Sequence, residues 1–252
     1  ISLNTLDYKN ELLNIKKYLP NFQETIKLQD HKILLNYKKN QLDINGNGKL
    51  IIEDKIDSLN YKIRKKNDEY NFKTNIDLNK NSLLIDILNY KKKENLSSIL
   101  KLSGKYKKDK HINFNSILLN EDQNSFFINN LKLDNEFKIF DIDSVDLNYI
   151  NQDQIQNNIR LKKNKKDYQI DGDTFDATNF IEGLLKDNDD DKDFSIFNNL
   201  NSNINIKIKK TYIDTLTYLE NFSGSIRYID NKINKLNLDA KFSNNKKIKI
   251  TI

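Results

Sequence analysis

The residues at positions 43–54 come closest to a known ligand-binding motif. Oxygen-bearing side chains recur at every second position and a glycine follows them, as in the calcium-binding loop of an EF-hand. The ligands of such a loop would be Asp43, Asn45 and Asn47, with Gly48 at the turn. The twelfth position normally holds Glu, and here it holds Asp54.

The flanks of this motif favour a strand. An EF-hand needs a helix on each side, whereas Leu42, Ile44, Leu50 and Ile52 share one parity through the glycines. Glycine within a strand often marks a bulge or a close backbone approach. We therefore expect a structural strand, and a calcium-dependent β module is an alternative.

Other candidate chemical groups are weaker. The acidic run 187–193 lacks the glycine and the closing Glu of a cation loop, so we expect a solvated loop. His31 and His111 lie far apart in the sequence and have no metal-type neighbours. We therefore predict no metal site.

Three aspartates could suggest the paired carboxylates of a glycoside hydrolase. Asp171, Asp173 and Asp176 lie close together, but a polar strand end followed by a helix cap explains them more simply. The sequence has no nucleophile elbow, phosphate-binding glycine loop or dinucleotide fingerprint. We predict that the protein is not an enzyme and needs no cofactor, and a hydrolase is the weakest alternative.

The composition bounds the partners. The chain has 252 residues, with 42 basic and 36 acidic side chains and a net charge of +6. The bias toward Lys and Asn is typical of an AT-rich genome, and the charges fall on outward strand positions, where solubility explains them. A nucleic-acid binder usually concentrates its basic residues on one face, so we predict no nucleic-acid partner. The absence of Cys excludes disulfides and zinc–thiolate sites.

The chain starts with Ile and contains no Met, which favours an internal piece of a longer protein. No apolar run approaches the ~20 residues that span a bilayer, and no signal peptide is visible.

Alternating apolar residues dominate the chain and predict a mainly β protein. We expect a long antiparallel meander that forms an elongated, curved sheet or groove within a single segment, 1–252. Residues 7–18 allow a short helix within 1–24, ended by Pro20. The strand meander covers 25–172, including a strand over Ile85–Tyr90. Residues 173–200 hold a helix at 176–186, capped by Asp176 or Thr178, and the acidic loop.

The C-terminal quarter, 201–252, has the clearest period of two. Short polar breaks at 229–232 and 243–247 predict hairpins, so its strands should be antiparallel. Alternation places one apolar set on a single face of the sheet. These residues are Ile204, Ile206, Ile208, Phe222, Ile226, Tyr228, Leu236, Leu238, Phe242, Ile248 and Ile250.

This region also resembles a known family. The pattern Leu-x-Asn-Phe-Ser-Gly-Ser-Ile-Arg-Tyr at 219–228, followed by Leu-Asn-Leu-Asp-Ala-Lys-Phe at 236–242, is similar to the repeating unit of AsmA-like proteins, the class of YhdP- and TamB-type bacterial envelope proteins. The segment 168–185, a strand ending in Gly-Asp-x-Phe-Asp before a short helix, resembles the same class. The resemblance covers 168–252. The residues before 168 resemble this class only in their general style.

The resemblance implies a fold and a function. AsmA-like proteins are elongated β-grooves with apolar interiors, anchored in the inner membrane of Gram-negative bacteria, that cross the periplasm and are implicated in phospholipid transport to the outer membrane. By that likeness, the eleven apolar residues would contact acyl chains, and the partners would be phospholipid and components of both membranes. The family's membrane anchor would lie in a segment absent from this sequence. The alternative is a β-rich structural or adhesion-type protein whose apolar face is closed core.

Overall fold

The computed structural model describes most of the chain. The described residues are 2–9, 18–19, 22, 25–52, 54–107, 111–185, 201–230 and 232–252. They form two compact units: unit 1 comprises residues 1–86 and 91–125, and unit 2 comprises residues 87–90 and 126–252.

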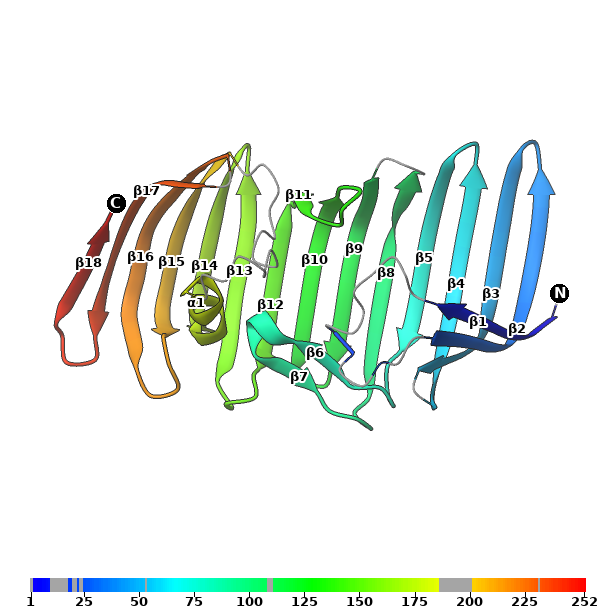
Figure 1. Cartoon of the computed structure of the whole chain (residues 1–252), viewed down its shortest axis with the longest axis horizontal. Coiled ribbons are helices and arrows are strands. Elements are labelled where there is room, and N and C mark those ends of the chain that lie inside the picture. Colours follow the sequence, from blue (N-terminus) through cyan, green and yellow to red (C-terminus); the bar gives the residue numbers. More distant parts are fainter. Residues whose placement is uncertain are drawn as a thin grey trace. The chain divides into compact units, whose positions relative to one another are not determined.

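The described part of the chain is mainly β, as predicted, with almost no helix. Sixteen of its strands belong to one large, mostly antiparallel sheet (Figure 1). In unit 1 the order is β1-β2-β3-β4-β5-β8-β9. Their bounds are Ser2–Lys9, Thr25–Lys38, Gln41–Ile52, Lys55–Lys66, Glu69–Asp77, Ser98–Lys107 and His111–Glu121.

Unit 2 continues the same plan with the order β10-β12-β13-β14-β15-β16-β17-β18, and β11 pairs with β10. The bounds of β10 to β14 are Asn124–Leu133, Ile139–Asp141, Ser144–Ile150, Gln156–Asn164 and Asp167–Asp176. The helix α1 follows at Thr178–Leu185. The bounds of β15 to β18 are Ser202–Tyr212, Tyr218–Ile229, Lys232–Phe242 and Lys247–Thr251.

Local sequence explains the hairpins. Many positive-φ residues lie in the turns, and most are Asn or Asp, which tolerate the left-handed backbone region. Lys39 and Asn40 join β2 to β3, Asn67 joins β4 to β5, and Asn245 precedes β18. The two-residue hairpins therefore twist in the sense that suits antiparallel strands.

Two short strands leave the main sheet. β6 (Leu83–Ile85) and β7 (Tyr90–Lys92) pair with each other, and a 3₁₀ turn, η2 (Asp86–Leu88), joins them. The predicted strand over Ile85–Tyr90 is therefore wrong, because the chain turns there. The apolar residues of this segment are of types common in strands. However, β6 and β7 are each only three residues long, and the residues between them form the turn.

The helix predictions divide. α1 confirms the helix predicted at 176–186. The helix predicted at 7–18 is wrong at its start, because residues 7–9 belong to β1, which pairs with β2. Residues 10–17 and the acidic loop 187–193 lie outside the described residues. Within the described residues, no helix has the length and apolar content that crossing a bilayer requires.

Hydrophobic cores cover one end of the strands in each unit. In unit 1, Leu19, Phe22, Leu50 and Ile52 are buried together. In unit 2, the rings of Tyr90, Phe126 and Tyr149 pack against one another, with centroids 4.5 to 5.8 Å apart. In unit 2 the strands continue beyond these rings to the candidate site.

Candidate apolar binding site

Cross-strand pairing fixes which side chains of unit 2 share a face. Residues directly opposite each other on neighbouring strands point to the same side of a sheet. Following these pairs across β12 to β18 gives one central row without a charged residue. Its members are Val145, Leu161, Ile170, Ile206, Gly224, Leu238 and Ile250. We call the side that carries this row the apolar face of unit 2, and the opposite side its polar face.

Two further rows flank the central one on the same face. One consists of Leu147, Ile159, Gly172, Ile208 and Phe222. The other consists of Tyr168, Ile204, Ile226 and Leu236. β14 and β15 pair in parallel within these rows. The apolar face therefore continues without a break from the C-terminal strands to β13 and β12.

All eleven residues predicted from the C-terminal quarter lie on this face. Tyr228 lies on this face because it is two residues from Ile226 on the same strand. Ile248 lies on it because it pairs with Ala240, which is two residues from Leu238. Phe242 pairs with Leu219, beyond an irregularity between Glu220 and Ser223. The extra residue lies on β16 and restores the facing of Leu219, whereas Phe242 keeps the facing of Leu238 and Ala240 by alternation along β17. Asn221 takes the positive φ of 52° that the bulge needs.

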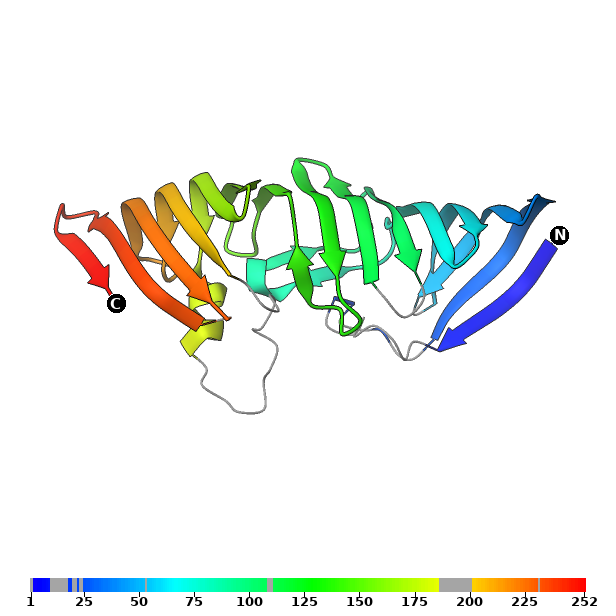
Figure 2. The ribbon, with the colours of Figure 1, turned by 90° about the horizontal axis from the view of Figure 1, so that it is seen from above.

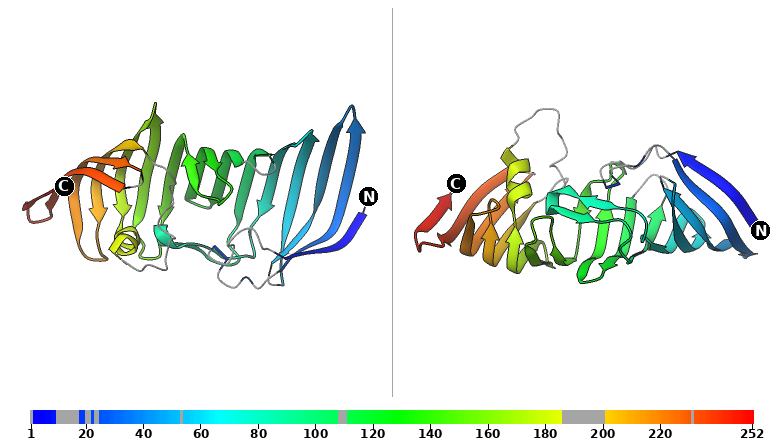
Figure 3. Two further views of the ribbon diagram at one scale, coloured as in Figure 1. Left: turned by 45° about the horizontal axis from the view of Figure 1, so that its top comes forward. Right: turned by 90° about the horizontal axis from the view of Figure 1, so that it is seen from below.

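One end of this face is covered. Tyr149 and Asn157 are fully buried, and Thr211 and Leu219 nearly so. Residues 87–90 pack over Tyr149, whose hydroxyl donates to the carbonyl of Leu88 at 3.1 Å. Figures 2 and 3 show α1 lying on one side of the strands of unit 2. The face is therefore a closed core at this end.

The rest of the face is open among the described residues. Ile208 and Leu236 are 4% and 8% exposed, Ile250 is 42% exposed, and the other eight predicted residues are half-buried. Each half-buried side chain keeps part of its aliphatic or aromatic group accessible, and these residues are neighbours on one face. The open part is therefore a surface of contiguous aliphatic groups, which is unusual for a protein surface without a partner.

A buried polar network holds α1 at the covered end. Asp176 accepts hydrogen bonds from the backbone amide of Thr178 at 3.0 Å and from the side-chain amide of Asn151 at 2.6 Å. Its own backbone amide donates to Asn157 at 2.7 Å. Asp176 is therefore the N-terminal cap of α1. It is one of the two residues, Asp176 and Thr178, that the sequence analysis predicted as the cap. The network ties the helix to β13 and so fixes where the covered end stops.

The electrostatics fit an apolar surface. Burial raises the pKa of the Tyr228 hydroxyl, and burial is also the main cause that raises the pKa of Tyr168. Beside the covered end, the Lys210 ammonium lies 4.7 Å from the ring centre of Tyr212 and 3.9 Å from that of Tyr218. This cation–π arrangement places the Lys210 ammonium against aromatic rings.

Sequence reasoning missed the upstream half of the face. Val145, Leu147, Leu161 and Ile170 belong to it, although only the C-terminal strands were predicted to carry the site. Their alternation was visible in the sequence. The parallel pairing of β14 with β15 could not be predicted from the sequence, because the connection between the two strands is too long to indicate a hairpin.

The EF-hand-like residues do not form a cation loop. Asp43, Asn45, Asn47 and Gly48 belong to β3, and Asp54 lies in the turn after it. Alternate residues of a strand are about 6.6 Å apart along the chain, so Asp43, Asn45 and Asn47 cannot converge on one ion. The hydrogen bond from Arg64 at 2.7 Å, with one from Gln41 at 2.8 Å, lowers the pKa of the Asp43 carboxyl. The strand prediction is confirmed. Gly46 and Gly48 mark close approaches, since a Cβ there would meet the rings of Tyr61 and His31.

The other candidates are dispersed. Asp171 and Asp173 lie on the polar face of unit 2, where Lys209 pairs with Asp173 at 2.6 Å, whereas Asp176 is buried in the helix cap. His31 is buried in β2, where its Nε2 lies 2.9 Å from the carbonyl of Lys49, and His111 begins β9. Among the described residues, no group of three or more His, Cys, Asp or Glu side chains could hold a metal ion.

Comparisons of the chain with protein-family models, with curated proteins and with solved structures found no match.

Proposed function

We propose that the chain is a non-enzymatic lipid-binding protein that holds phospholipid acyl chains on the apolar face of unit 2. The observation that carries the proposal is the central row, which runs from Val145 to Ile250 without a charge and is open above β15 to β18. An open aliphatic surface in water is stabilised by an apolar occupant.

The magnitudes suit an acyl chain. Each buried CH₂ contributes about 0.8 kcal/mol, so a chain of many such groups gains a large favourable term. The row crosses seven strands, and the four that are open, β15 to β18, make a track of about 14 Å at a spacing of about 4.8 Å. Aliphatic rows offer no polar group that would fix one register. A lipid could therefore slide along the face.

The resemblance to AsmA-like proteins supplies the cellular setting of the proposal. In that setting the protein lies in the periplasm, is anchored to the inner membrane through a further segment, and passes phospholipid between the two membranes. Its partners are then the lipid and the membrane components at each end.

The test is site-specific photo-crosslinking in cells that produce the full-length protein. A photoreactive residue replaces Ile206, on the apolar face, or Lys207, the next residue of β15 on the polar face. Leu238 and Asp239 of β17 form a second matched pair. We expect phospholipid adducts, identified by mass spectrometry, at positions 206 and 238 and not at 207 and 239.

Two other results would reject the proposal. Equal adducts at both members of a pair would mean non-specific contact with membranes. Adducts at neither member would mean that another layer of protein covers the face, as in the structural or adhesion-type alternative.

A further inference from the structure

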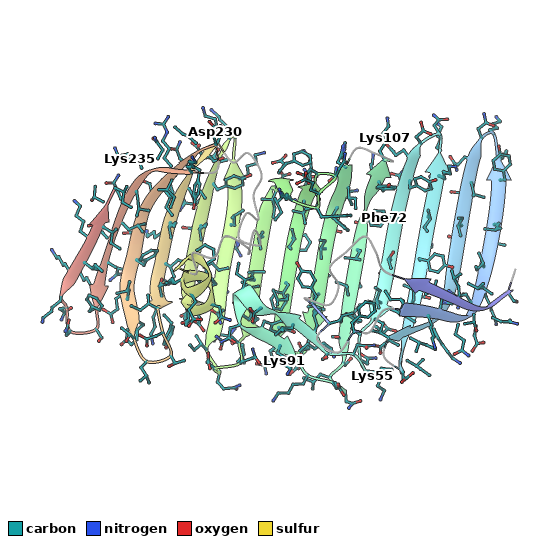
Figure 4. All side chains as sticks on the ribbon, in the orientation of Figure 1. Lys55, Phe72, Lys91, Lys107, Asp230 and Lys235 are labelled. Atoms are coloured by element: carbon teal, nitrogen blue, oxygen red, sulfur yellow. The ribbon has the colours of Figure 1, made fainter. Side chains whose placement is uncertain are left out.

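The polar face of unit 1 carries two neighbouring rows that contain lysines and no acidic residue. This face is the side opposite Ile44, Ile63 and Phe72, the last of which Figure 4 labels. The first row consists of Lys32, Asn47, Asn60, Asn75, Lys101 and Leu118. The second consists of Leu34, Asn45, Lys62, Lys73, Ser103 and Ser116.

The lysines of these rows are uncompensated. Lys62 and Lys73 lie directly opposite each other on β4 and β5, and like charges in this position destabilise a sheet. Lys32, Lys62, Lys73 and Lys101 are exposed, and none of them pairs with a carboxylate among the described residues. Acidic residues of this face are already engaged, since Asp43 pairs with Arg64 and Glu69 with Lys105. The face therefore has an unmet preference for negative charge.

The same rows are hollowed. One depression of about 770 Å³ has Asn45, Asn60, Lys62 and Lys73 in its lining. A second, of about 700 Å³, shares Asn45, Lys62 and Lys73 with the first and extends to Ser103. Its lining also includes Asp43, whose charge is compensated by Arg64. The opposed lysines thus lie where the two hollows meet. The combined surface is an elongated trough rather than a point site or a flat patch.

Amide groups fill the trough between the lysines. Asn45, Asn47, Asn60 and Asn75 make no side-chain hydrogen bond to another described residue. An amide both donates and accepts, as a sugar hydroxyl does, whereas a phosphate oxygen only accepts. The two rows contain no aromatic ring, and Tyr61 and Phe72, which also border the hollows, have the strand parity of the opposite face. The rows therefore lack the stacking platforms with which proteins bind single-stranded nucleic acid.

We propose that this trough binds a linear acidic polysaccharide, in which carboxylate or sulfate groups meet the lysines and hydroxyl groups meet the asparagine amides. The inference is independent of lipid binding, because it concerns another unit and the polar side of the sheet.

The test measures binding of the full chain to oligogalacturonate, a hydroxyl-rich uronic acid polymer, by calorimetry at low salt. The comparison ligand is polyglutamate of equal charge, which has carboxylates without hydroxyls. The test variant is Lys62→Gln/Lys73→Gln. The matched control is Lys207→Gln/Lys249→Gln, which removes the same charge from the polar face of unit 2.

We expect oligogalacturonate to bind at least about tenfold more tightly than polyglutamate, and the Lys62/Lys73 variant to lose about tenfold in affinity while the control loses less than about twofold. Asn45→Ala/Asn60→Ala should weaken binding of oligogalacturonate and leave that of polyglutamate unchanged. Equal affinity for both ligands would overturn the proposal in favour of an acidic peptide. Equal losses in the two lysine variants, or no binding at all, would also overturn it.

Discussion

The central rows of the two polar faces use the same residue types in opposite arrangements, although nearer its edge unit 2 also places Arg227 opposite Lys235 and Lys241 opposite Lys247. Across unit 2, one row of paired residues places opposite charges next to each other wherever two charged residues are paired. Its members are Asp146, Arg160, Asp171, Lys207, Ser223, Asp239 and Lys249. Arg160 and Asp146 form an ion pair of 2.9 Å in this row. In unit 1, the corresponding central row places Lys62 against Lys73 instead.

The difference separates composition from arrangement. Both units belong to one chain, so the same bias toward Lys and Asn acts on both. Solubility is enough to explain the charges of the central row of unit 2, where every basic residue has an acidic neighbour. It is not enough for unit 1, where lysines accumulate beside amides in a hollow.

The covered ends differ in a similar way. Unit 2 closes its apolar face with the aromatic rings of Tyr90, Phe126 and Tyr149. Unit 1 also buries an ionic group: the Lys92 ammonium donates to the carbonyls of Asn81 at 2.7 Å and Lys93 at 2.8 Å, with Asp57 and Glu121 nearby. The covered end of unit 2 is held by the packing of aromatic rings, and that of unit 1 is held by buried charges as well. Substitutions can distinguish the two.

The largest effect should follow from Tyr149→Ala in unit 2. Tyr149 is fully buried and contacts both other rings, so its removal leaves a cavity and should lower the free energy of unfolding by about 3–5 kcal/mol. Urea denaturation measures this change. Tyr37→Ala, at a residue 70% exposed in unit 1, is the control and should change stability by less than about 0.5 kcal/mol. Similar losses in the two variants would mean that Tyr149 is not part of a packed core.

A smaller loss with a different pH dependence should follow from Lys92→Met in unit 1. The variant leaves buried carboxylates without their cation, which should lower the free energy of unfolding by about 3 kcal/mol at neutral pH. Burial lowers the pKa of Lys92 below its ordinary 10.5. The unfolded chain therefore holds this proton more tightly, and the stability of the original protein should gain a contribution as the pH rises from the folded pKa toward 10.5.

Lys92→Met should lack that alkaline contribution. The measurement is the urea midpoint of each protein as the pH is raised toward 10.5. Lys91→Met, at the exposed neighbouring residue, should behave like the original protein. If both variants kept the same pH dependence, the charge of Lys92 would have no part in closing unit 1.

The sequence predicted on which face of the sheet a residue lies better than it predicted which residues are its neighbours. Alternation alone placed Ile204 to Ile250 on one side, because successive residues of a strand point to opposite faces. Helical spacing found α1, and Asp176 was among its predicted caps. These features depend on residues close together in the sequence.

The rest depends on pairing between distant residues. The covering segment of β6, η2 and β7 has strand-like residues but packs over the main sheet, which no local period indicates. The parallel pairing of β14 with β15 and the opposition of Lys62 to Lys73 exist only once the register is known. For that reason the sequence attributed the lysines to solubility and did not find the trough.

The smallest effects test the charge arrangement directly, because the same kind of substitution should have opposite signs in the two units. Asp171→Lys in unit 2 places a third cation between Arg160 and Lys207 and should lower the free energy of unfolding by about 1 kcal/mol or less. Lys62→Glu in unit 1 places an anion opposite Lys73 and should raise it by a similar or smaller amount.

Salt separates this cause from any change in packing. Both effects act between exposed charges, so 1 M salt should shrink them, while the neutral variants Asp171→Asn and Lys62→Gln should give intermediate values. Changes of the same sign in the two units, or changes that salt leaves intact, would show that charge compensation does not distinguish the faces. Opposite, salt-sensitive signs would mean that unit 1 retains a repulsion that a single substitution can remove, as expected of a surface kept for an anionic ligand rather than for stability.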